Sequence, residues 1–270
     1  MSLRLIAIET GNTRTRIGRF DGDALEAMES HANEHLEAIA TTVADWWSEI
    51  ARGDADRVMV SASVNEPIAA RLRGMIEDRT GAEVYVIGED LPIPIGESLD
   101  PETITGQDRL LAAAAAWDTL KQACIVIDAG TAVTVDFVDG EGTFHGGAIA
   151  PGARMQLQAL HEHTAALPLL EFARPDATEA FGRNTAQAML HGVYDGIRGL
   201  VWRLVERYSE SYGAFPMVVA TGGDAELLFG DDELVNRIVP ELTLRGIAVA
   251  ARHAMADDGG DGGPLRRDHA

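Results

Sequence analysis

The feature that most constrains the fold is a long-range internal repeat. A shift of 119 residues aligns the segment Ile6-Ala7-Ile8-Glu9-Thr10-Gly11-Asn12 with Ile125-Val126-Ile127-Asp128-Ala129-Gly130-Thr131. Each copy is an apolar strand that ends in an acid and enters a glycine turn. A period this long indicates duplication of a whole lobe, because solenoid repeats recur every 20 to about 50 residues. We therefore predict an α/β protein with an N-terminal lobe over residues 1–118, a C-terminal lobe over 119–256 and a disordered tail over 257–270.

Apolar patterning predicts the elements around the repeat. In the first lobe we expect strands over 3–9, 15–20, 58–60 and 84–87, and helices over about 34–51, 67–79 and 106–121. In the second lobe we expect strands over 124–128, 133–138 and 217–220, another strand that reaches Ile149, and helices that follow Pro151-Gly152 and span 185–212 and 243–254. Residues 90–103 are rich in proline, glycine and acids, which predicts a loop.

Charge and composition exclude several classes of function. The chain carries 22 Lys and Arg against 43 Asp and Glu, a net charge of −21, which argues against a nucleic-acid partner. No apolar run approaches the roughly 20 residues needed to span a bilayer, and the N-terminus lacks a signal-peptide pattern. The single cysteine, Cys124, sits in an apolar run and reads as a buried structural thiol. These features predict a cytoplasmic protein that does not bind membranes.

The two acid-glycine hairpins have the residue types that a phosphate site needs. Glycine lets the backbone approach a ligand closely, and an acid at a strand end can hold Mg²⁺ between its carboxylate and substrate phosphates. One such hairpin could equally be an ordinary β-hairpin, but two at matched positions predict that a polyphosphate is held from both sides. A third turn, Thr221-Gly222-Gly223, follows a strand and suits a nucleotide, or is a plain strand-to-helix turn. No Walker A pattern is present, so a P-loop kinase is excluded.

A further motif, Gly106-Gln107-Asp108-Arg109, lies at the start of a predicted helix. An aspartate in the first turn commonly stabilises the helix dipole. Alternatively, Asp108 is a general base that accepts the proton of a substrate hydroxyl. Arg109 would then bind a substrate carboxylate through two parallel hydrogen bonds.

Taken in order, the motifs resemble those of type III pantothenate kinases, which catalyse the first step of coenzyme A biosynthesis. The resemblance runs from about residue 3 to 252, and it is specific because of the order and spacing of the motifs. It implies two duplicated RNase H-like lobes of the actin, hexokinase and Hsp70 superfamily. The matching segments are Glu9–Thr13, Gly106–Arg109, Asp128–Thr131, Gly146–Gly152, Thr164–Pro168, Gly182–Thr185 and Thr221–Gly223.

The resemblance also implies substrates, cofactors and residue roles. The substrates would be pantothenate and ATP, with Mg²⁺ and a monovalent cation, K⁺ or NH₄⁺, as cofactors. The protein would be a homodimer with the pantothenate pocket near the dimer interface. Asp108 would be the catalytic base, Asp128 would hold the monovalent cation and Glu9 would be a candidate for Mg²⁺. Pantothenate would be bound by Gly106, Gln107, Asp108, Arg109 and Thr185, and ATP by Glu9, Thr10, Gly11, Asn12, Thr13, Arg14, Thr15, Arg16, Thr131, Gly222 and Gly223.

Two positions depart from the family pattern. The first acid is normally aspartate, and the extra methylene of Glu9 moves the carboxylate by about 1 Å, which matters for the strict geometry of Mg²⁺. A tyrosine often found before the Gly-x-Asp-Arg motif is replaced by Ser98-Leu99. Two alternatives therefore stay open: a non-catalytic nucleotide-binding or regulatory accessory homologue, and a kinase of another small hydroxylated substrate.

One histidine pair suggests metal binding at first sight. In His161-Glu162-His163 the two imidazoles are two residues apart, so they point to different faces of a helix. We therefore expect a solvated helix start rather than a metal site.

Overall fold

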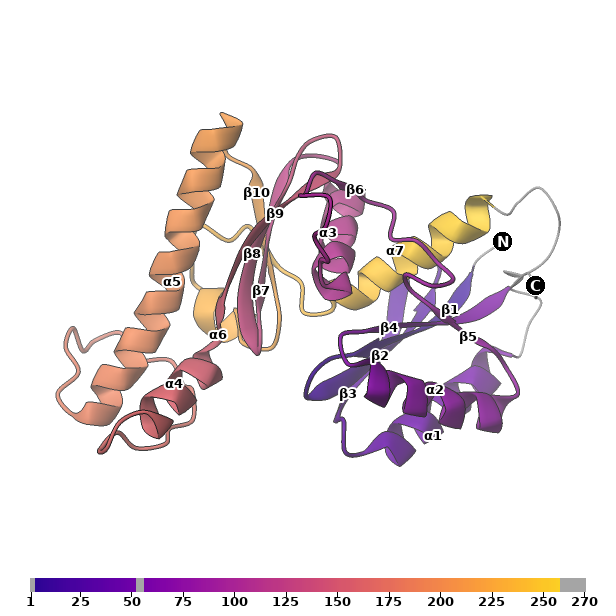
Figure 1. The fold of residues 1–270 in the computed structure, drawn as a ribbon, viewed down its shortest axis with the longest axis horizontal. Coiled ribbons are helices and arrows are strands. Elements are labelled where there is room, and N and C mark those ends of the chain that lie inside the picture. The colour runs from indigo at the N-terminus through magenta and orange to yellow at the C-terminus, as the bar shows by residue number, and fades with distance from the viewer. Residues whose placement is uncertain (1–2, 52–55, 258–270) are drawn as a thin grey trace. The chain divides into compact units, whose positions relative to one another are not determined.

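The computed structural model describes residues 3–51 and 56–257, which form two compact units. The first unit comprises the described residues up to Ile95, then Glu102–Asp118 and the segment from Leu242 onward. The second comprises Gly96–Pro101 and Thr119–Glu241. Each unit contains one β-sheet (Figure 1). The tail expected over 257–270 lies outside the described residues, except for Asp257, which ends the last helix.

The first sheet has the strand order β3-β2-β1-β4-β5. Its central strand β1 is antiparallel to β2 and parallel to β4, and its side chains are buried on both faces, which explains its nearly continuous apolar sequence. Helices α1 and α2 cover one face and α7 covers the other (Figure 1). The elements are β1 (Arg4–Thr10), β2 (Arg14–Asp21), β3 (Ala24–Ala32), α1 (Leu36–Ile50), β4 (Arg57–Ser63), α2 (Glu66–Thr80), β5 (Val84–Val86), α3 (Gln107–Leu120) and α7 (Leu242–Asp257).

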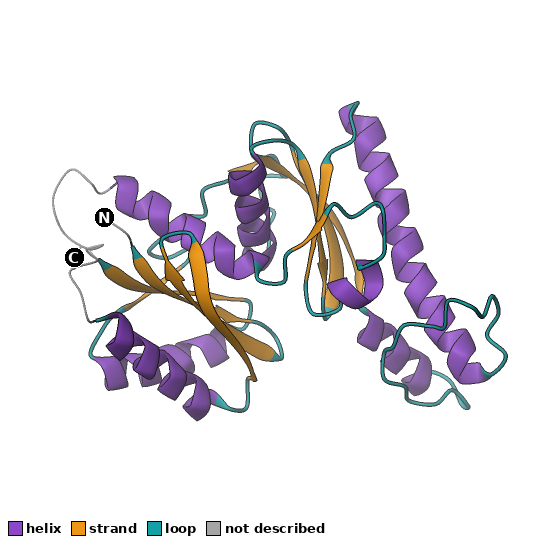
Figure 2. Cartoon of the chain, turned by 180° about the vertical axis from the view of Figure 1, so that it is seen from behind, coloured by secondary structure: helices purple, strands orange, loops and turns teal. Residues whose placement is uncertain are grey.

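The second sheet repeats this topology. Its order is β11-β10-β7-β8-β9-β6, in which β7 is antiparallel to β8 and parallel to β10, as β1 is to β2 and β4. The long helix α5 runs along one face of the sheet, which it covers together with α4 and α6 (Figure 2). The elements are β6 (Gly96–Glu97), β7 (Cys124–Ala129), β8 (Ala132–Val138), β9 (Thr143–Pro151), α4 (Ala153–Glu162), α5 (Thr185–Tyr212), β10 (Met217–Thr221), α6 (Ala225–Phe229) and β11 (Arg237–Ile238).

Helix α7 belongs to the first unit, whereas we expected residues up to 256 to lie in the second lobe. Its apolar side chains Leu244 and Ile247 join the cluster of Leu5, Phe20 and Val60 on the first sheet. The sequence pattern showed an apolar helix face but not which sheet the face would cover. The chain thus returns to the first unit after completing the second.

Two smaller expectations also differ from the structure. Strand β3 was not predicted, because its residues, such as Leu25, Glu26 and Met28, are good helix formers; its pairing with β2 overrides that preference. His161 and Glu162 lie at the end of α4, not at a helix start, and His161 Nδ1 donates a hydrogen bond to the Leu167 carbonyl at 2.8 Å.

Across residues 3–51 and 56–257, we find no helix that is long and apolar enough to cross a membrane.

Cys124 is fully buried at the start of β7, as expected for a structural thiol. Burial raises the pKa of its thiol to about 12, so the thiol stays protonated at neutral pH. A protonated, inaccessible thiol is a poor nucleophile.

Gly246 provides a test of how α7 is held. A Cβ atom at this position would lie 2.2 Å from the Leu111 carbonyl oxygen of α3, so we expect Gly246→Ala to lower the free energy of unfolding by roughly 1–3 kcal/mol. Gly74 in α2 is the matched control, because a Cβ there would meet nothing within 4 Å. Gly74→Ala should raise the stability by about 0.5–1 kcal/mol. Urea denaturation measures both, and equal effects would contradict the close approach of α7 and α3.

Candidate active site

The first acid-glycine turn connects β1 and β2. The strands pair in a register that places Glu9 opposite Arg16 and Thr10 opposite Thr15. The Gly11 N–H donates a hydrogen bond to the Arg14 carbonyl at 2.9 Å, which closes the turn. Asn12, Thr13 and Arg14 are exposed at its tip, so their polar groups are accessible to a ligand.

Asn33, which sequence reasoning missed, braces this turn. Its side-chain N–H donates to the Gly11 carbonyl at 2.9 Å, and its side-chain oxygen accepts from the Thr15 hydroxyl at 2.9 Å. Its backbone N–H donates to the Thr13 carbonyl at 3.0 Å. One side chain therefore fixes both sides of the turn. No local pattern marks Asn33, because its role depends on the pairing of β3 with β2.

The ionised form of the Glu9 carboxylate is disfavoured by its surroundings. Burial is the main reason that its pKa lies above the ordinary glutamate value; the Arg16 guanidinium opposes the shift and the charge of Asp108 adds to it. The Glu9 carboxylate and the Arg16 guanidinium are 3.4 Å apart. The two carboxylates of Glu9 and Asp108 thus lie within electrostatic range of each other in the first unit, where a divalent cation would relieve their repulsion.

The Gly106-x-Asp-Arg motif begins α3, as predicted. The Arg109 N–H donates to the Asp108 carboxylate at 2.9 Å, and a Cβ at position 106 would lie 2.6 Å from that carboxylate. A side chain at position 106 would therefore displace the Asp108 carboxylate from this position. Gln107 donates its side-chain N–H to the Ile87 carbonyl at 3.0 Å, so it anchors the helix start to the segment after β5.

Three turns of the second unit meet at the end of β7. A Cβ on Gly222 would lie 2.4 Å from Asp128 Oδ1 and 2.4 Å from the Ala129 carbonyl oxygen, and Gly222 has φ +95°. A Cβ on Gly152 would lie 2.2 Å from the Gly130 carbonyl oxygen. These two glycines are therefore needed for close packing of the backbone. Gly223 has open space around it, so its side-chain position remains accessible.

Asp224, whose role was not predicted from the sequence, holds these turns together through two hydrogen bonds. Its side chain is almost completely buried and accepts a hydrogen bond from Arg154, at the start of α4, at 2.8 Å. Its backbone N–H donates to the Ala129 carbonyl at 2.9 Å. The Asp224–Arg154 ion pair therefore joins the Thr221–Gly223 turn to α4. In the sequence, only the position of Asp224 directly after the glycine cluster pointed to this role.

Three residues with side-chain oxygen atoms lie at the same level on the neighbouring strands β8, β7 and β10. The strand registers place Asp128 next to Thr221 on β10 and next to Thr134 on β8. Thr221 is 1% exposed, and its hydroxyl has no hydrogen-bond partner within the described part of the chain. Buried hydroxyls normally have a partner, and carboxylate and hydroxyl oxygens are ligands of hard cations. Within that same part, no cluster of three or more His, Cys, Asp or Glu has the geometry of a metal site.

The predicted site residues fall into two groups. Glu9–Arg16 and Gly106–Arg109 lie in the first unit, whereas Asp128, Thr131, Thr185 and Gly222-Gly223 lie in the second. Thr185 is the exposed first residue of α5, and the side chain of the preceding Asn184 accepts the Gln187 N–H at 2.9 Å. The residues predicted to bind pantothenate therefore come from both units.

Two units that share the order of five strands, each with an acid-glycine turn after its central strand, give the protein a fold of the actin, hexokinase and Hsp70 type. Two solved structures show this fold. Component A of the Acidaminococcus fermentans (R)-2-hydroxyglutaryl-CoA dehydratase aligns with a TM-score of 0.54 and 14% identity over 95% of this chain and 99% of its own. A conserved putative Baf family transcriptional activator from Campylobacter jejuni aligns with a TM-score of 0.60 and 18% identity over 93% and 99%.

Sequence relatives narrow the class to a family. The family model for type III pantothenate kinase matches residues 5–207. A type III pantothenate kinase from Rhodospirillum rubrum is 38% identical over 260 residues, which cover 94% of this chain and 100% of the relative. One from Dehalococcoides mccartyi is 35% identical, covering 92% and 97%. The chain belongs to the type III pantothenate kinase family.

The raised pKa of Glu9 predicts a dependence of stability on pH. Below the ordinary glutamate pKa, Glu9 is protonated in the folded and unfolded chains alike. As the pH rises through that value the unfolded chain ionises first, so the folded state loses stability until the pH passes the folded pKa. The unfolding free energy of Glu9→Gln minus that of the wild type should therefore increase as the pH rises from below the ordinary glutamate pKa to neutral.

This measurement uses urea denaturation without nucleotide or divalent cation. Glu26→Gln is the matched control, because Glu26 also pairs with an arginine, Arg19 at 3.2 Å, but at the surface. A difference for Glu9→Gln that stays constant over the same pH range would contradict the raised pKa.

Proposed function

We propose that this chain transfers the γ-phosphate of ATP to the primary hydroxyl of pantothenate, which gives 4′-phosphopantothenate and ADP, the first step of coenzyme A biosynthesis. The observation that carries the proposal is the pair of acid-glycine turns at matched positions in a chain of this family. Relatives that span over nine-tenths of the chain bear the same family name, which does not favour an accessory protein or a kinase of another substrate.

In this proposal the first unit supplies the base. Asp108 accepts the proton of the pantothenate hydroxyl while the oxygen of that hydroxyl bonds to the γ-phosphorus and the bond to the bridging oxygen of ADP breaks. Arg109 binds the pantothenate carboxylate. Residues Thr10 to Arg16 bind the ATP phosphates, aided by the turn that Asn33 holds in place. Mg²⁺, when bound, would neutralise phosphate charge, and Glu9 is the carboxylate of this unit that would hold it, which leaves Asp108 free to act as the base.

The second unit supplies contacts to ATP through Thr131 and the Gly222-Gly223 turn. We propose that Asp128 holds a monovalent cation, K⁺ or NH₄⁺, and that the buried hydroxyl of Thr221 is a second ligand. The cation would offset phosphate charge beside a protein of net charge −21.

We also propose that the active protein is a cytoplasmic homodimer in which Thr185 contributes to the pantothenate site. The support is the exposure of three large apolar side chains of the second unit, Met155 on α4 and Leu169 and Phe181 in the segment between α4 and α5. Sedimentation of the purified protein measures the oligomeric state.

The catalytic base is tested by Asp108→Asn. Loss of a general base should lower turnover by about 10² to 10⁴-fold with little change in ATP binding. Asp118→Asn on the same helix is the control, because Asp118 binds Arg252 at 3.0 Å in a structural contact. Pantothenate-dependent ADP release measures turnover. Near-normal turnover of Asp108→Asn refutes the base, and wild-type protein without any such release refutes the proposed function.

The cation site is tested by Thr221→Val. The unfolding temperature of the wild type should be higher in KCl than in tetramethylammonium chloride at equal ionic strength, a comparison that cancels charge screening. Thr221→Val should lose this K⁺-specific difference, whereas Thr221→Ser, which keeps the hydroxyl, should retain it. An undiminished difference in Thr221→Val excludes Thr221 as a ligand, and no difference in the wild type excludes the site.

A further inference from the structure

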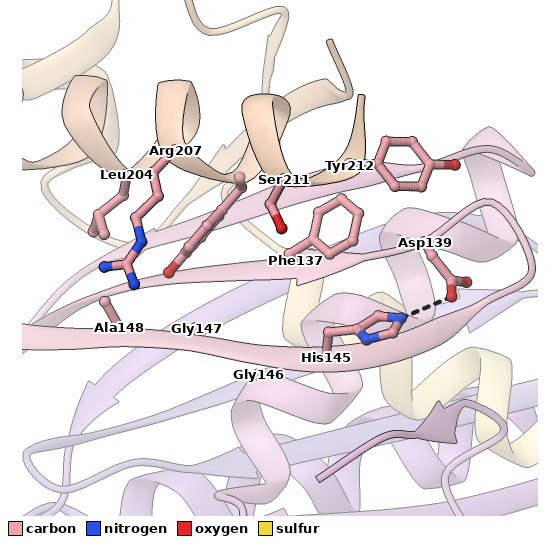
Figure 3. Close-up of a pocket in the computed structure, with 11 residues that line it drawn as sticks. Phe137, Asp139, His145, Gly146, Gly147, Ala148, Leu204, Arg207, Ser211 and Tyr212 are labelled. Carbon is pink, nitrogen blue, oxygen red and sulfur yellow. Dashed lines mark hydrogen bonds and ion pairs between the residues drawn. The ribbon is translucent and has the colours of Figure 1, made fainter. Parts of the chain in front are cut away.

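A pocket of about 590 Å³ lies in the second unit between the C-terminal half of α5 and strands β8 and β9. Figure 3 shows Leu204, Arg207 and Ser211 extending from α5 toward the strands that carry Phe137, His145 and Ala148. Its volume falls within the range of small-molecule sites, roughly 300–1,000 Å³. None of its lining residues has a role in the proposed reaction.

Aromatic side chains form one end of this pocket. The ring centroid of Phe137 lies 5.1 Å from that of Tyr212, 6.5 Å from that of Tyr208 and 5.7 Å from that of His145. Gly146 and Gly147 present only backbone on the strand side. A flat ring could therefore stack beside Phe137 and Tyr212 and extend over the backbone of Gly146 and Gly147.

The charge of the pocket is set by Arg207. Its guanidinium points into the cavity (Figure 3) and forms no hydrogen bond or ion pair with the residues that the structure describes. The other charged pair is internally satisfied: Asp139 Oδ2 lies 2.7 Å from His145 Nε2. Although burial alone would raise its pKa, hydrogen bonds from His145 and from the Thr143 and Glu141 N–H groups hold the pKa of Asp139 below its ordinary value. Arg207 is thus the unpaired charge of the pocket.

We propose that this pocket binds a small aromatic carboxylate, with the ring against Phe137 and Tyr212 and the carboxylate on Arg207. A single arginine matches a monoanion, because it forms two parallel hydrogen bonds with one carboxylate. A polyphosphate would bring more negative charge than one arginine can neutralise. Phe137 on β8 is six residues after Thr131, which directly precedes that strand, so about 20 Å of extended chain separates the aromatic end of the pocket from the ATP turn.

The probe is 2-naphthoate, and its neutral amide, 2-naphthamide, is the ligand control. Titration followed by the line widths of the ligand's NMR signals measures binding to the full chain. The key variant is Arg207→Gln. Arg203→Gln is its matched control, since Arg203 lies one turn earlier on α5, pairs with Glu206 at 2.6 Å and does not line the pocket. Tyr212→Ser removes an aromatic wall, whereas Tyr212→Phe keeps it.

We expect 2-naphthoate to bind the wild type and Arg203→Gln equally, and to bind Arg207→Gln about tenfold more weakly. 2-Naphthamide should bind all three alike, at the weaker level. Tyr212→Ser should weaken both ligands and Tyr212→Phe neither. Equal binding of 2-naphthoate to Arg207→Gln and Arg203→Gln would overturn the assignment, as would no detectable binding of 2-naphthoate to the wild type. Unchanged thermal unfolding of Arg207→Gln verifies that the variant is folded.

Discussion

In both units a carboxylate stands where a buried central strand reaches the edge of the hydrophobic core, and the neighbouring strands place polar groups beside it. Arg16 on the neighbouring strand offsets part of the cost of burying the ionised Glu9 carboxylate. The offset is incomplete, because the pKa of Glu9 stays above its ordinary value. Beside Asp128 lie two threonines, Thr134 and Thr221, and the Thr221 hydroxyl has no hydrogen-bond partner among the residues that the structure describes. Carboxylate and hydroxyl oxygens are ligands that hard cations prefer, which is why we propose a cation beside each of these acids. Both turns join a central strand to an antiparallel neighbour, but an arginine lies beside the carboxylate in the first and two threonines lie beside it in the second.

Much of this arrangement follows from local sequence. The repeat around Glu9 and Asp128 predicted two similar sheets, and the strand orders of the two units agree with it. The Gly106–Arg109 segment predicted a helix start, because an acid in the first turn is a local signal. The contacts that hold the site were not predictable in the same way. Asn33 acts across a strand pairing, and Asp224 acts through Arg154, 70 residues away along the chain.

Strand β3 and helix α7 show the other limit of sequence reasoning. The residues of β3 favour a helix, and their partner β2 decides otherwise. The apolar face of α7 was visible in the sequence, but its destination was not, since either sheet offers an apolar surface. Close approach at Gly246 and the cluster around Leu244 determine that it covers the first sheet. The division of the site residues between two units is likewise a property of topology rather than of any motif.

The return of α7 to the first unit has a consequence for how the chain is made. Residues Thr119 to Glu241 of the second unit are contiguous and precede α7, so the ribosome synthesises the whole second unit before it synthesises that helix. The first sheet is in the opposite position: its strands emerge early, but the face formed by Leu5, Phe20 and Val60 lacks its covering helix until the last segment of the chain appears. The half of the protein that is translated first is therefore the half that is completed last, and until α7 is made its uncovered apolar face is a surface through which the nascent chain can aggregate.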